Sequence, residues 1–116
     1  IDAAMNDLLR PALYDTYHPL VTVREPSDNK KTLFDIVGPI CESGDTFQHS
    51  VNLPTINTGD LVAFSSAGAY GAVMASEYNT RPLVPEVLVS GNLYAPIRNR
   101  PLISEIISRD KVPEWL

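Results

Sequence analysis

The fold class is decided by the stretch LVTVREPSDNKKTLFDIV at residues 20–37, which carries two strand-like segments around a polar cluster. Residues 20–25 alternate apolar and polar side chains and stop at Pro26, and residues 32–37 return with a similar pattern. The cluster at residues 27–31 consists of turn-forming and charged side chains. Alternation of this kind is typical of half-buried strands, so we predict a β-hairpin made of these two segments.

Strand patterns also dominate the second half of the chain. Residues 61–64 follow a turn and are short and apolar enough for a buried strand. Residues 86–89 and 93–98 flank a Ser-Gly-Asn sequence, which is typical of the turn between two strands. Residues 41–52 show no such pattern, and we predict that they form a loop and a polar stretch.

Short helices are expected at three places. Apolar side chains recur at helical spacing over residues 5–13, where Pro11 either breaks the segment into short turns or begins a second turn. Residues 72–75 fit one or two helical turns, and residues 101–109 fit a short amphipathic helix. Short strands and 10 prolines together predict a mainly β fold, a Greek-key-like β-barrel or sandwich with short helical inserts.

Composition excludes several classes of function. The 116 residues suffice for one domain, and the formal net charge of −5 without a basic stripe argues against nucleic-acid binding. Neither a polybasic patch nor an apolar run of about 20 residues is present, so we expect no membrane association. The single cysteine cannot form an internal disulfide, which fits a reducing, cytoplasmic compartment. The sequence starts without methionine, and we expect it to be a piece of a longer chain.

The single cysteine stands in the pentapeptide CESGD at residues 41–45. Cys41 could be buried and inert, which is the commoner state of a lone cysteine. Glu42 and Asp45 could be solvated loop acids, or Asp45 could be a cap or turn residue. As neighbours of the cysteine they disfavour a thiolate and suit a thiol that stays protonated and acts as an acid. A Cys-His pair with His49 lacks an evident third orienting group. The 2 histidines have no zinc-type spacing to the cysteine, so we expect no metal site.

Two further groups could bind a ligand. Arg10 could bind a carboxylate in bidentate fashion and shares a helical face with Tyr14; otherwise it is a surface arginine beside an amphipathic tyrosine. Tyr70 lies in a glycine-containing stretch at residues 67–71 that would let the backbone approach a ligand closely, and its phenol could donate to a phosphate. The alternative for Tyr70 is a flexible turn in which the ring packs against the core.

Four segments together resemble one family. Residues 5–14, 38–45, 68–71 and 78–82 are similar, in order and spacing, to the C-terminal half of diaminopimelate decarboxylases, which are fold-type III, alanine-racemase-like pyridoxal phosphate (PLP) enzymes. The resemblance covers roughly residues 1–98 and is loose at 46–58.

The resemblance implies an organisation. The whole enzyme would be a homodimer whose subunits combine a TIM-barrel domain with a C-terminal β-domain, and residues 1–116 would be that β-domain. PLP would be bound covalently by a lysine of the TIM barrel, which this chain lacks. The whole enzyme would convert meso-2,6-diaminopimelate to L-lysine and CO2, and the chain alone would be inactive. A decarboxylase of another basic amino acid and a non-catalytic β-barrel interaction module remain the alternatives.

The resemblance also implies roles for individual residues. Cys41 would be the proton donor, and Glu42 would read the distal end of the substrate, both in the active site of the partner subunit. Arg10 and Tyr14 would help bind the distal carboxylate. Tyr70 would contact cofactor and substrate.

Overall fold

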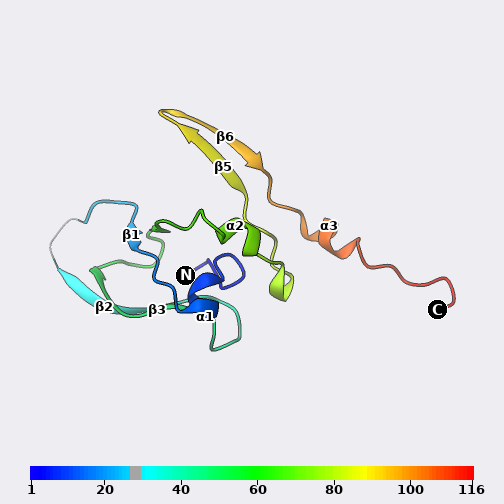
Figure 1. Ribbon diagram of the computed structural model, residues 1–116, viewed down its shortest axis with the longest axis horizontal. Coiled ribbons are helices and arrows are strands. Elements are labelled where there is room, and N and C mark those ends of the chain that lie inside the picture. Colours follow the sequence, from blue (N-terminus) through cyan, green and yellow to red (C-terminus); the bar gives the residue numbers. More distant parts are fainter. Residues whose placement is uncertain (27–29) are drawn as a thin grey trace. The chain divides into compact units, whose positions relative to one another are not determined.

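The computed structural model describes residues 1–26 and 30–116, which form two compact units (Figure 1). The N-terminal unit spans residues 1–75 and the C-terminal unit spans residues 76–116. The N-terminal unit contains, in chain order, α1 (Arg10–Tyr14), β1 (Leu20–Thr22), β2 (Lys31–Val37), β3 (Thr46–Pro54), β4 (Val62–Phe64) and α2 (Gly71–Met74). The C-terminal unit contains the 3-10 helix η1 (Tyr78–Thr80), β5 (Glu86–Ser90), β6 (Leu93–Arg98) and α3 (Ile103–Ile107).

The pairing predicted between residues 20–25 and 32–37 is wrong. β1 pairs antiparallel with β4, so that Leu20 lies opposite Phe64, and β2 pairs antiparallel with β3. The prediction joined the two nearest strand patterns, whereas the packing of Leu20 in the core favours a partner far along the chain. Of the predicted turn at residues 27–31, residues 27–29 lie outside the described part of the chain.

β3 occupies a stretch that was predicted as loop and polar residues, and two irregularities in its pairing explain the error. Phe34 pairs with Val51 and Ile36 pairs with Gln48, so an extra β3 residue faces Asp35. Another register shift lies between Ile36 and Val37. Such bulges interrupt the alternation of side chains on which strand prediction depends.

The core of the N-terminal unit lies between the N-terminal segment and the strands. Its buried cluster draws on the segment before α1 and on β1, β2 and β3, and it consists of Leu8, Leu20, Ile36, Phe47 and Leu53. The rings of Phe47 and Phe64 stack at an angle with their centroids 4.7 Å apart. This close packing fixes segments that are far apart in the sequence against one another, and it thereby restrains the ends of the loops that connect them.

The helical prediction for residues 5–13 is only partly correct, because α1 begins at Arg10. Residues 5–7 form a turn in which the Asp7 carboxylate accepts the N–H of Ala4 at 2.9 Å. Pro11 stands in the first turn of α1, where its missing N–H has no helical partner to lose. α1 ends at Tyr14, and its C-cap residue Asp15 adopts a left-handed conformation with φ 55°.

The C-terminal unit contains the hairpin that the sequence predicted. β5 and β6 pair antiparallel, with Ser90 opposite Leu93, and Gly91 supplies the positive φ of 58° that the two-residue turn requires. The helix expected at residues 101–109 is confined to α3.

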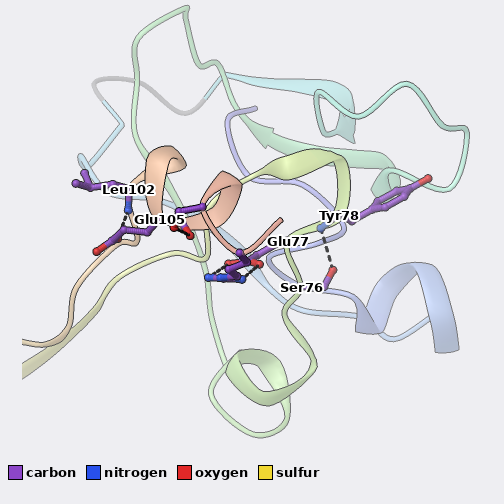
Figure 2. Close-up of polar contacts among 7 residues, drawn as sticks. Ser76, Glu77, Tyr78, Leu102 and Glu105 are labelled. Carbon is purple, nitrogen blue, oxygen red and sulfur yellow. Dashed lines mark hydrogen bonds and ion pairs between the residues drawn. The ribbon is translucent and has the colours of Figure 1, made fainter. Parts of the chain in front are cut away.

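Polar contacts order the ends of the C-terminal unit (Figure 2). A Glu105 carboxylate oxygen accepts the N–H of Leu102 at 2.6 Å, at the start of α3. Arg109 donates to both carboxylate oxygens of Glu77, at 2.5 and 3.1 Å. This hydrogen bonding with Glu77, and secondarily the charge of Glu77, holds the pKa of Arg109 above its ordinary value.

The mainly β class with short helices is confirmed. The described strands form three two-stranded antiparallel sheets and do not close into the expected barrel. A barrel requires each strand to be paired on both edges, whereas each described strand has one partner. No helix in the described ranges is long and apolar enough to cross a bilayer.

Candidate active site

The connection between β2 and β3 is a closed turn that presents Cys41. The Gly38 N–H donates to the carbonyl of Asp45 at 2.9 Å, and the Glu42 N–H donates to the carbonyl of Ile40 at 2.8 Å. The Asp45 N–H donates to the carbonyl of Glu42 at 3.0 Å. Cys41 is a free, exposed thiol on this turn, and Glu42 beside it is also exposed. Cys41 is therefore not buried within the described chain.

The side chain of Asp45 anchors this turn from inside. Asp45 is 2% exposed, and its two carboxylate oxygens accept the N–H of Ile40 at 2.7 Å and that of Met5 at 2.6 Å. A Cβ atom on Gly38 would overlap the carboxylate, so this position accommodates only glycine next to Asp45. The sequence offered Asp45 as an acidic neighbour of the cysteine or as a cap or turn residue, but it did not indicate the burial, because burial of a loop aspartate leaves no mark on hydrophobic patterning.

Arg10 and Tyr70, far apart in the sequence, lie together. The Arg10 guanidinium carbon lies 5.5 Å from the centre of the Tyr70 ring, within cation–π range. Tyr70 has φ 63° and precedes the buried Gly71. A Cβ atom added to Gly71 would lie 3.8 Å from the Leu8 side chain. The stretch at residues 67–71 therefore brings the tyrosine to α1 and leaves its side chain exposed.

The guanidinium of Arg10 has a donor that is available to a ligand. The Nε atom of Arg10 is buried and has no hydrogen-bond partner among the described residues. Tyr14 lies four residues further on in α1 and is exposed. A guanidinium with an unused buried donor and a neighbouring exposed phenol can together bind an anion.

The structure joins the predicted site residues into two groups. One is the Cys41–Glu42 turn, and the other is the set on and beside α1, namely Arg10, Tyr14 and Tyr70. In the described part of the chain, no hydrogen bond or ring contact joins Cys41 to Arg10 or Tyr70.

The two histidines have different surroundings. The Nδ1 atom of His49 lies 3.6 Å from a carboxylate oxygen of Asp35, an exposed pair on the β2–β3 sheet, and the described structure does not join it to Cys41. His18 is buried, with neither ring nitrogen hydrogen-bonded among the described residues. Residues 1–26 and 30–116 contain no group of three or more His, Cys, Asp or Glu side chains that could hold a metal ion.

The described chain thus combines short antiparallel sheets with an exposed thiol on a turn that a buried carboxylate anchors. Residues 1–68 match the family described as pyridoxal-dependent decarboxylase, C-terminal sheet domain, and the chain belongs to this family.

Individual relatives are diaminopimelate decarboxylases. The chain is 49% identical over 116 residues to the diaminopimelate decarboxylase of Zymomonas mobilis and 43% identical over 116 residues to that of Archaeoglobus fulgidus. It spans 27% and 28% of the length of these relatives, respectively, and 100% of the chain is covered in both. The matched proteins therefore contain a further large region that is not represented here.

Solved structures show the same relationship. The chain is similar to diaminopimelate decarboxylase from M. jannaschii with a TM-score of 0.93 at 39% identity, covering 100% of this chain and 26% of that one. The same enzyme in complex with L-lysine gives a TM-score of 0.92. The similarity extends over both compact units.

Proposed function

We propose that the chain is the C-terminal β-domain of a diaminopimelate decarboxylase, and that residues 1–116 form one domain of the whole protein. The whole protein would convert meso-2,6-diaminopimelate to L-lysine and CO2 with PLP, in the cytoplasm. The observation that carries the proposal is the 49% identity to a diaminopimelate decarboxylase over the entire chain.

The described residues fit a supporting part of a PLP site. The exposed phenol of Tyr70 can contact a ring or donate to a phosphate, and the cationic Arg10 beside it favours anions. None of the candidate site residues is a lysine, and the resemblance implies that a TIM-barrel lysine outside the chain binds PLP covalently. When bound, PLP draws away the electrons that remain on the substrate carbon after CO2 leaves.

Cys41 holds the proton that the substrate carbon then takes up. Its thiol is exposed on a turn with a fixed backbone, so it can reach a substrate bound outside this domain. A thiol held beside the substrate carbon is a competent general acid.

The distal end of diaminopimelate carries an ammonium and a carboxylate, and the chain offers a group for each. Arg10, with an unpartnered buried Nε, and Tyr14 bind the carboxylate, while Glu42 attracts the ammonium. Ornithine and arginine lack a distal carboxylate and leave Arg10 unsatisfied, which disfavours them as substrates.

The resemblance to diaminopimelate decarboxylases supports a site shared between subunits. In a homodimer the Cys41–Glu42 turn of one subunit would complete the site of its partner.

Substrate comparison with the full-length, PLP-loaded protein tests the proposal. We expect CO2 release from meso-diaminopimelate to exceed release from ornithine or arginine by about 100-fold or more in kcat/KM. Faster turnover of ornithine or arginine would identify a decarboxylase of another basic amino acid. Absence of turnover with every amino acid would favour the non-catalytic interaction module.

A further inference from the structure

The turn that presents Cys41 is held by a single buried carboxylate. Asp45 is 2% exposed, and the described ion pairs do not include it, so its partners are backbone N–H groups. Hydrogen bonds to an ionised carboxylate are roughly twice as strong as neutral ones. Burying this group is tolerable only while these donors remain in place.

The two bonds of Asp45 connect different parts of the candidate site. Oδ2 accepts the N–H of Ile40, which directly precedes Cys41. Oδ1 accepts the N–H of Met5, in the segment that leads into α1 and Arg10. The Asp45 carboxylate thus fixes the backbone that precedes Cys41, and it connects this turn to the segment that leads into Arg10.

The turn is built around this carboxylate. Asp45 also uses its main chain, because its N–H donates to Glu42 and its carbonyl accepts from Gly38. Gly38 lacks the Cβ atom that would displace the carboxylate. Cys41 and Glu42 therefore lie between two fixed ends, and their own side chains stay exposed.

We propose that Asp45 is a positioning residue that holds the Cys41–Glu42 turn in the conformation needed for proton delivery. The inference rests on the proposed function, in which Cys41 is the acid. A displacement of about 1 Å in a reacting group can lower a rate by about 100-fold, so a turn without its anchor delivers the proton less well.

The test is a double-mutant cycle in the full-length, PLP-loaded protein. Asp45→Asn keeps the size of the side chain but replaces one acceptor oxygen by an amide NH2, which cannot accept a backbone N–H. We expect Asp45→Asn to lower kcat for diaminopimelate by about 10-fold and to raise KM by no more than about 3-fold, because Glu42 lies on this turn but Arg10 and Tyr14, which bind the distal carboxylate, do not. In a Cys41→Ala background the same change should lower the residual kcat by less than about 2-fold.

Asp60→Asn is the matched control. Asp60 also accepts one backbone N–H, from Asn57 at 2.7 Å, but in an exposed turn of its own. We expect kcat to stay within about 2-fold of the original protein, since surface changes of this kind have small effects.

The outcomes separate the inference from the proposed function. Unchanged kcat in Asp45→Asn, with Cys41→Ala strongly impaired, would overturn the inference alone, and so would an equal loss in both backgrounds. Original turnover in Cys41→Ala would overturn the proposed role of Cys41 and the inference with it.

If Asp45→Asn does not fold, Gly38→Ala, which displaces the carboxylate without removing it, takes its place. Failure of both variants to fold would show that Asp45 holds the whole domain and would overturn the specific positioning role.

Discussion

The described part of the chain contains two antiparallel β-hairpins that differ in how they are stabilised. The β2–β3 hairpin packs one side on the core, has two bulges and closes through a turn anchored by Asp45. The β5–β6 hairpin closes through a two-residue turn at Gly91, and most of its apolar side chains are exposed. Local sequence specifies the second hairpin, whereas the first depends on contacts with distant segments.

The difference explains why the candidate acid lies on the first hairpin. A reacting group must be exposed to its substrate yet held in one geometry. The turn between β2 and β3 meets both needs, because Cys41 is exposed while Asp45 is buried beneath the same turn. The turn at Gly91 has no comparable buried anchor among the described residues.

The largest expected difference between the hairpins lies in their core contacts. Phe47 of β3 is 6% exposed and stacks on Phe64, so Phe47→Ala should destabilise the β2–β3 hairpin by about 3–5 kcal/mol. Tyr94 of β6 is 79% exposed, and Tyr94→Ala should change the stability of its hairpin by about 0.5 kcal/mol or less. Amide hydrogen exchange of the strands in the 116-residue chain measures both. Equal losses in the two hairpins would break the comparison.

A smaller effect is expected at the anchor itself. Gly38→Ala should destabilise the β2–β3 hairpin by about 1–3 kcal/mol, because the added methyl group overlaps the Asp45 carboxylate. In an Asp45→Ala background the overlap is gone, and the same change should be nearly neutral. Hydrogen exchange of the β3 amides in the four chains of this cycle checks the coupling. Additive losses would show that the two residues do not share one space.

A smaller effect than at the anchor is expected at the base of the second hairpin. The Nη2 atom of Arg98 on β6 lies 2.7 Å from a carboxylate oxygen of Glu86 on β5. Both side chains are more than a third exposed, Arg98 at 38% and Glu86 at 36%. Glu86→Gln should therefore destabilise the hairpin by at most about 1 kcal/mol, and less at high salt. Hydrogen exchange of the β5 amides at low and high salt measures it. A loss as large as that of Phe47→Ala would mean that the second hairpin also has a strong anchor.

The two hairpins also mark how far the fold could be predicted. β5, β6 and their turn follow from short-range signals around Gly91 and were predicted correctly. β3 was not predicted, because bulges opposite Asp35 and at Phe47 interrupt the alternation of its apolar and polar side chains. The pairing of β1 with β4 depends on packing between segments far apart, which no local pattern contains.

For the candidate site, residue types could be predicted and contacts could not. Cys41 and Glu42 were identified from their neighbours and from the resemblance, and the structure places both on an exposed turn. The stacking of Arg10 on Tyr70 and the buried bonds of Asp45 arise only when the N-terminal segment folds against residues far along the chain. The roles of these residues in turnover stay predictions.

The central claim is that Cys41 supplies the proton in a diaminopimelate decarboxylase. The most direct measurement is the kcat of CO2 release and lysine formation by the full-length, PLP-loaded Cys41→Ala protein, with Ser43→Ala in the same turn as the control. We expect Cys41→Ala to lower kcat by about 100-fold or more with unchanged PLP content, and Ser43→Ala to stay within about 3-fold of the original protein. Turnover by Cys41→Ala at the original rate would contradict the account.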